Sequence, residues 1–224
     1  MDFSSIVSAL PDLLQGMLLT LKLLVFAVAG GIALGTLLAL ARLSSNRLLS
    51  FLAGFYVNYF RSIPLLLVIT WFYFIVPFML AWATGKMHPV GAFASSLVAF
   101  MMFEAAYYCE IVRAGIQSIP KGQVNAAYAL GLNYHQAMRL VVLPQAFRKM
   151  APLLLQQSII LFQDTALVYA VGLMDFLNTA RSRGDITGQL HEFLLFAGVI
   201  YFVLSFIASR IVLRLQSKLA VGQN

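Results

Sequence analysis

The chain has 224 residues, of which 61% are apolar and only 10% are charged. Soluble domains are about half apolar and about a quarter charged, so this composition excludes an ordinary soluble domain and indicates a membrane protein. The 15 Lys and Arg residues outnumber the 8 Asp and Glu residues, and in a membrane protein such an excess sets orientation and does not indicate nucleic-acid binding.

Five stretches are apolar enough to cross a bilayer core of about 30 Å, which takes about 20 residues of helix. They are residues 16–41, 51–83, 90–108, 150–173 and 193–213. The second is too long for one straight span and contains Pro64 and Pro77, so we expect it to tilt or break. We therefore expect an all-α, polytopic protein in which residues 1–224 form a single transmembrane domain of five helices.

The charges between the spans predict orientation, because cytoplasmic loops carry an excess of Lys and Arg. Lys86, Arg181 and Arg183 lie on one side of the expected topology. Ten basic residues lie on the other side: Arg42, Arg47, Arg113, Lys121, Arg139, Arg148, Lys149, Arg210, Arg214 and Lys218. This bias predicts an N-terminus outside and a C-terminus in the cytoplasm. The N-terminal segment has no basic residue and its apolar run is long, so we expect an uncleaved first span.

A polar stretch, residues 119–147, interrupts the apolar sequence after the third span on the cytoplasmic side. Residues 119–122 should end the third helix, and residues 123–130 suit a short helix that Gly131 ends in a left-handed conformation. Asn133 can cap the next helix, with Gln136 three residues later completing a capping box. We expect a helix–turn–helix along the membrane surface that a soluble partner grips; the alternative is an amphipathic surface helix without a partner.

The second helix of this loop also has a periodic apolar face. Its members recur at the spacing of one helix face and are Ala137, Leu140, Val141 and Pro144. Such a spacing is typical of an amphipathic helix and favours a helix–turn–helix that lies along the membrane surface.

This loop resembles the EAA loop of the membrane subunits of ABC importers, in which EAA is followed by Gly and then by I-x-L-P. The matching residues are Asn125-Ala126-Ala127, Gly131 and Val141-Val142-Leu143-Pro144. The resemblance implies that the first short helix docks in a groove on an ATPase. The coupling residues would then be Asn125, Ala126, Ala127, Tyr128 and Gly131. Asn125 stands where the family usually has Glu.

Three further segments extend the resemblance to the polar amino acid permeases, in the order of that family. Residues 60–64, FRSIP, are similar to its R-G-T-P signature; residues 106–115, AYYCEIVRAG, to its A-Y-x-x-E-I-x-R-x-G run; and residues 162–167, FQDTAL, to its K-D-T-S-L segment. Within this family, which includes histidine, glutamate, glutamine, arginine and opine importers, the segments look most like the glutamate/aspartate permeases.

The resemblance implies a type I ABC importer fold and import of a polar amino acid by alternating access. It also implies an ATPase dimer, a periplasmic or surface-tethered binding protein, a second permease subunit and residence in a bacterial inner membrane. The chain has no P-loop motif, so we expect no cofactor of its own and expect ATP and Mg²⁺ on the partner ATPase. The alternatives are an ATP-independent secondary transporter or channel and an intramembrane enzyme, although no catalytic constellation stands out.

Ionisable residues inside spans are expensive and usually functional. Arg61, Glu104 and Asp164 fall in the second, third and fourth expected spans. An arginine binds a carboxylate with two hydrogen bonds and a carboxylate suits an ammonium group, so the three could hold an amino acid substrate. In the alternative interpretation, which stays open, Arg61 simply pairs with Glu104 or Asp164 to make burial tolerable.

Other polar residues suit structural roles. Glu110 and Arg113 are three apart on one helix, which favours a structural ion pair near the cytoplasm. Lys22 should extend its ammonium group to the interface. Cys109 has no second cysteine to pair with, and we expect a buried thiol. His88, His135 and His191 are scattered, so no metal site is expected.

Overall fold

The computed structural model describes residues 4–86 and 90–220, and within them the backbone forms helices and turns without a strand. The elements in chain order are α1 (Ser4–Leu43), α2 (Arg47–Arg61), α3 (Leu65–Thr70), η1 (Trp71–Ile75), α4 (Val76–Thr84), α5 (Ala92–Gln117), α6 (Lys121–Ala129), α7 (Tyr134–Ala137), η2 (Met138–Val142), α8 (Leu143–Asp164), η3 (Thr165–Val171), α9 (Phe176–Thr187) and α10 (Leu190–Ala220). Five of the described helical runs are long and apolar enough to cross a membrane, as expected from the sequence.

The second span differs from the prediction for residues 51–83. The helix is interrupted between Arg61 and Leu65, so α2 is a separate helix and the span itself runs from Leu65 to Thr84. Proline disfavours helical geometry in the residue before it, which explains why the break falls at Pro64. The α2 helix is amphipathic and buries Ala53, Val57 and Phe60 on one face.

Pro77, in contrast, does not break the helix. The preceding residues Trp71–Ile75 form a π-helical turn, in which the Val76 N–H bonds to the carbonyl oxygen of Trp71. Pro77 then occupies the first turn of α4, where its missing N–H is tolerated. The helix therefore continues through Pro77 to Thr84 as one span.

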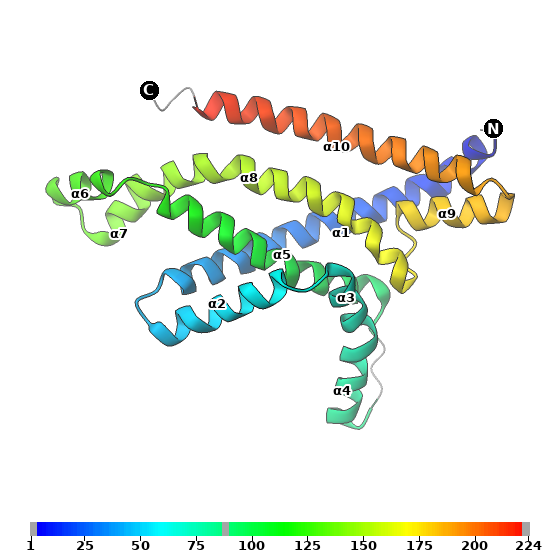
Figure 1. Ribbon diagram of the computed structural model, residues 1–224, viewed down its shortest axis with the longest axis horizontal. Coiled ribbons are helices and arrows are strands. Elements are labelled where there is room, and N and C mark those ends of the chain that lie inside the picture. The colour runs from blue at the N-terminus through cyan, green and yellow to red at the C-terminus, as the bar shows by residue number, and fades with distance from the viewer. Residues whose placement is uncertain (1–3, 87–89, 221–224) are drawn as a thin grey trace.

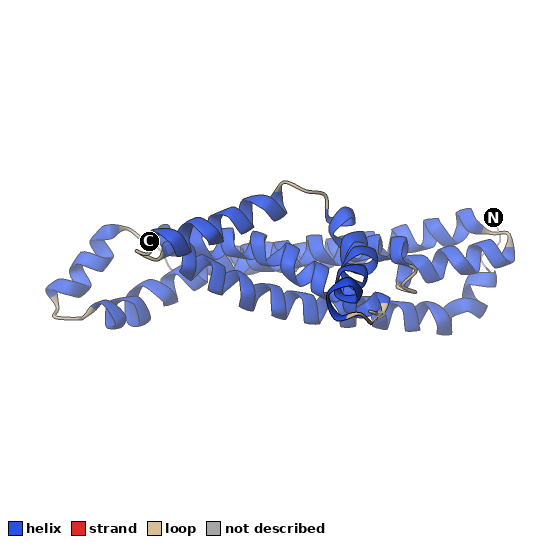
Figure 2. Cartoon of the chain, turned by 90° about the horizontal axis from the view of Figure 1, so that it is seen from below, coloured by secondary structure: helices blue, strands red, loops and turns tan. Residues whose placement is uncertain are grey.

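The helices form an elongated body with two distinct ends (Figures 1 and 2). The α6–α7 hairpin, the α1–α2 connection and the C-terminal end of α10 lie at one end, whereas the N-terminus and α9 lie at the other (Figure 1). The segments that carry the ten basic residues of the sequence prediction gather at the hairpin end, and α9, with Arg181 and Arg183, lies at the opposite end. The basic residues of α9 and those near the hairpin thus lie at opposite ends of the body.

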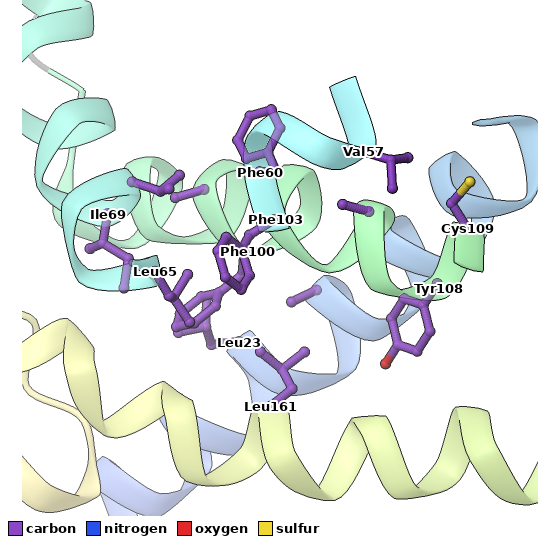
Figure 3. Packing of buried hydrophobic residues seen from close by; sticks show 14 of the residues in the cluster. Leu23, Val57, Phe60, Leu65, Ile69, Phe100, Phe103, Tyr108, Cys109 and Leu161 are labelled. Atoms are coloured by element: carbon purple, nitrogen blue, oxygen red, sulfur yellow. The ribbon is translucent and has the colours of Figure 1, made fainter. Parts of the chain in front are cut away.

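The main core lies where α1, α2, α3, α5 and α8 meet (Figure 3). Leu23, Phe100 and Leu161 are fully buried there and come from three different helices. The third span is longer than the predicted residues 90–108, because α5 continues to Gln117. Its burial through Val112 and Gly115 keeps it helical up to the hairpin end.

Glycines allow α1 and α5 to pack closely. A Cβ atom added at Gly35 would lie 2.8 Å from the Tyr108 Cβ and 2.9 Å from the backbone oxygen of Ala105 and the backbone nitrogen of Cys109. Two of these atoms are backbone atoms, which cannot move without moving α5 itself. Small residues in membrane helices allow such close backbone contact, and the packing then supplies the association energy.

We therefore expect Gly35→Ala to push α1 away from α5 and to destabilise the protein by about 1–3 kcal/mol, the usual effect of overpacking. Gly198→Ala on α10 is the matched control, because a Cβ there meets nothing within 4 Å and alanine favours a helix. Thermal unfolding of both variants in lipid nanodiscs measures the difference. Equal melting temperatures would contradict the close α1–α5 contact.

Candidate functional site: a coupling hairpin and a polar span interior

The α6–α7 hairpin has the turn chemistry that its sequence predicts. Gly131 adopts φ +81°, its N–H donates to the Tyr128 carbonyl oxygen at 2.9 Å, and the Leu132 N–H donates to the Ala127 carbonyl oxygen at 3.1 Å. These bonds form a Schellman motif, which only glycine accommodates without strain. Asn133 and Gln136 form the expected capping box, with both hydrogen bonds at 2.9 Å.

The first helix of the hairpin presents most of the predicted coupling residues outward. Asn125, Ala126 and Tyr128 are exposed, whereas Ala127 is only 3% exposed and faces the hairpin interior. Leu130 is 83% exposed, although it is a large apolar residue at the last turn. Leu130 is not among the residues predicted from the sequence, although an apolar residue directly before the helix-ending glycine was an available signal.

The second helix of the hairpin is continuous with the fourth span, since helix runs from Tyr134 to Val171. Of the periodic apolar face, Ala137 is buried but Leu140 is 63% exposed, and the next buried residues are Val142 and Ala146. The cause is the π-helical turn η2, Met138–Val142, which adds one residue per turn and rotates the face. A regular helical period could not indicate that shift.

The hairpin is fixed to the spans by a small core of its own. Ile119, Val142 and Ala146 form this cluster, with Val124 of α6 and Met138 packed against it. The Lys149 Nζ of α8 also donates to the backbone oxygen of Ser118 at 3.1 Å. The hairpin is therefore anchored to the end of α5 and to the start of α8.

The three ionisable residues predicted to bind substrate lie in different surroundings. Arg61 ends α2, is exposed, and holds its guanidinium 5.4 Å from the centroid of the Tyr107 ring. Asp164 is the half-buried last residue of α8. Among the described residues, no ion pair joins Arg61 to Glu104 or Asp164.

Glu104 of α5 is fully buried and faces α8. Its two carboxylate oxygens accept hydrogen bonds from the Gln157 Nε2 at 3.3 and 3.1 Å. One turn further along α5, the Tyr108 hydroxyl lies 3.0 Å from the Ser158 Oγ. Gln157 and Ser158 are not among the residues predicted from the sequence, although polar residues inside an apolar span commonly form hydrogen bonds across helices.

Glu110 binds two arginines. Its Oε2 lies 2.6 Å from the Arg113 Nη2, as the spacing on α5 predicts, and its Oε1 also pairs with the Arg42 Nη1 of α1. The second contact links two helices that are far apart in sequence. The sequence could not indicate it, because it depends on how α1 packs against α5.

Cys109 is buried, as expected. Lys22 is exposed, with its Nζ 5.8 Å from the centroid of the Phe93 ring. The residues that the structure describes contain no group of His, Cys, Asp and Glu that could hold a metal ion, and His88 lies outside them.

These features define a multi-pass membrane protein in which a polar hairpin at one end is fixed to two of its spans. Residues 31–221 match the family described as binding-protein-dependent transport system inner membrane component, and the chain belongs to that family. It is therefore the membrane-spanning component of a transport system that works with a substrate-binding protein and a separate ATPase.

Individual relatives are similar to this chain over nearly its whole length. The glutamate/aspartate import permease protein GltK of Escherichia coli O6:H1 is 53% identical over 221 residues, which cover 98% of each chain. The arginine transport system permease protein ArtQ of Bacillus subtilis is 36% identical and covers 98% of this chain and 97% of its own. A crystal structure of an amino acid ABC transporter with histidines matches with a TM-score of 0.88 at 30% identity, covering 97% of this chain and 99% of that chain.

Proposed function

We propose that this permease imports acidic amino acids, glutamate and aspartate, across a bacterial inner membrane. The observation that carries the proposal is the 53% identity to a glutamate/aspartate import permease along 98% of both chains. The direction of transport, into the cell, follows from the description of that relative as an import permease and from its family. The ATP and Mg²⁺ would bind to the partner ATPase, because the sequence has no P-loop motif.

A second permease subunit, either a paralogue or another copy of this chain, would complete the pathway. Five helices enclose too little space for a pore on their own. ATP-driven closure of the ATPase dimer would press on α6, and the cluster around Ile119 and Val142 would pass that movement to α5 and α8. The pathway would then open alternately to the two sides of the membrane.

Arg61 is the residue that we propose for the substrate carboxylate. Its guanidinium is exposed, lies over the Tyr107 ring and has no carboxylate partner among the described ion pairs. A planar guanidinium can stack on an aromatic ring and still donate a fork of hydrogen bonds. Glu104 and Asp164 would serve the ammonium group, and the hydrogen bonds from Gln157 would orient Glu104.

The competing function is an ATP-independent secondary transporter or channel. Such a protein needs no ordered dock for an ATPase, whereas the hairpin here has a Schellman turn, a capping box and an exposed leucine. These features favour the ATP-driven importer.

Uptake into proteoliposomes that contain the complete complex tests the substrate. We expect ATP-dependent uptake of labelled glutamate that unlabelled aspartate competes away and arginine does not. The binding protein alone should be assayed in parallel, because it could restrict the substrates by itself. Competition by arginine in the presence of a binding protein that does not bind arginine would contradict the proposed preference.

We propose that the hairpin end faces the cytoplasm, with the N-terminus outside. The segregation of the basic segments at the hairpin end supports this orientation. A fluorescent reporter that folds only in the cytoplasm should light up when fused after residue 224, and an alkaline phosphatase fused there should be inactive. An active phosphatase with a dark reporter would reverse the topology and remove α6 from the reach of an ATPase.

A further inference from the structure

We infer that Glu110 joins α1 to α5 so that both helices move as one body with the coupling hairpin, and that Arg42 is the positioning residue that makes this link. The inference rests on the proposed ATP-driven function. It differs from a local ion pair on α5, because its essential contact crosses between two spans. Among the ion pairs of the described residues, the Arg42–Glu110 pair is the one that links α1 to α5.

The geometry assigns different work to the two arginines. Arg42, in the last turn of α1, contacts Glu110 through Nη1. Arg113 uses two nitrogens, since Nη2 lies 2.6 Å from the Glu110 Oε2 and Nη1 donates to the Gln117 Oε1 at 2.8 Å. Arg113 therefore holds the Glu110 carboxylate in place along α5. Arg42 binds the same carboxylate from α1 and so links the two helices.

The link lies close to the hairpin in the sequence and in space. Glu110 is seven residues before the end of α5 at Gln117, and α6 begins at Lys121. Gly115, between them, packs against Met150 of α8. The cluster of Ile119, Val142 and Ala146 then fixes the hairpin to this end of α5. The end of α5 nearest the hairpin thus lies about two helical turns beyond Glu110.

Neighbouring hydrogen bonds join α2 to both α1 and α5. The Ser50 Oγ of α2 donates to the Arg42 carbonyl oxygen at 2.9 Å, and the Tyr56 hydroxyl of α2 donates to the Met102 carbonyl oxygen at 2.7 Å. The close contact at Gly35 locks α1 and α5 nearer the centre. Because packing at Gly35 already joins α1 and α5, the ionic link adds a polar contact between them further toward the hairpin.

The variant Arg42→Gln tests the link, because it removes the charge and keeps a polar side chain at a partly exposed position. In the reconstituted complex we expect ATP hydrolysis to remain responsive to the loaded binding protein, while uptake per ATP hydrolysed falls by a factor of roughly 2 to 30, the range of measured coupling effects. Arg47→Gln is the matched control: Arg47 is exposed at the same end, on α2, and should change nothing.

Conservative variants separate coupling from simple structural support. Arg42→Lys should restore the ratio of uptake to hydrolysis, because Arg42 reaches Glu110 through a single nitrogen. Arg113→Lys should retain only part of the ratio of uptake to hydrolysis, because a lysine cannot bind Glu110 and Gln117 with one planar group. If Arg42→Gln fails to assemble, Glu110→Gln is measured with the same readout.

An unchanged ratio of uptake to hydrolysis in an assembled Arg42→Gln or Glu110→Gln complex would overturn the inference. A lower melting temperature with an unchanged ratio would overturn it too, since the link would then be structural support alone. Uptake by the unaltered complex without ATP hydrolysis would contradict the proposed function instead, so the two failures are distinguishable.

Discussion

The variant Gly131→Pro should abolish uptake while the protein stays in the membrane and binds its partner permease. Proline fixes φ near −65°, whereas Gly131 needs φ +81°. It also removes the N–H that donates to the Tyr128 carbonyl oxygen. A misplaced proline costs about 3 kcal/mol or more, so the Schellman turn should open and α6 should lose its fixed direction.

The control for this prediction is Gly131→Ala. A Cβ atom at Gly131 meets nothing within 4 Å, so alanine adds only the cost of a left-handed backbone, about 1–2 kcal/mol. We expect reduced uptake from Gly131→Ala and none from Gly131→Pro, measured beside co-purification of the ATPase. Normal uptake by the proline variant would mean that the angle of α6 does not matter for transport.

The variant Arg61→Lys should lower uptake roughly ten- to hundredfold, which corresponds to losing one charged hydrogen bond of about 1.5–3 kcal/mol. Lysine keeps the positive charge but loses the planar fork that fits a carboxylate and stacks on the Tyr107 ring. Arg61 is exposed at the end of α2, so the exchange should not disturb folding. Binding-protein affinity and assembly of the complex should stay normal.

Tyr107→Phe provides the matched control for Arg61, because it keeps the ring beneath the guanidinium and removes only the hydroxyl. We expect it to transport nearly as well as the unaltered protein. Full uptake by an assembled Arg61→Lys complex would show that the charge alone suffices at this position. The carboxylate would then have to be bound by backbone amides or by the partner subunit.

The sequence predicts most of the fold because its signals are local. Apolar runs of sufficient length locate the five spans, and Gly131, Asn133 and Gln136 specify the turn and cap of the hairpin. Pro64 ends the helix, because the residue before a proline is disfavoured in the helical region. Each of these effects depends on neighbours within a few residues.

The features that sequence analysis missed depend on tertiary packing. The π-helical turn at Met138–Val142 rotates the buried face from Leu140 to Val142, and no regular period contains that extra residue. The hydrogen bonds from Gln157 to Glu104 and the contact of Arg42 with Glu110 join residues that are 53 and 68 positions apart. Such pairs follow from the close approach of α1, α5 and α8, which no local pattern records.

Site-directed crosslinking tests most directly whether α6 connects this chain to a separate ATPase. Single cysteines at Ala126, Tyr128 and Leu130, in a Cys109→Ser background, occupy the exposed surface of the hairpin. A cysteine at the buried Ala127 is the matched control. We expect the three exposed positions to crosslink to the ATPase, to be protected from a soluble thiol reagent in the full complex, and to react freely when the ATPase is removed. Free labelling of all three positions in the assembled, transporting complex would contradict the account.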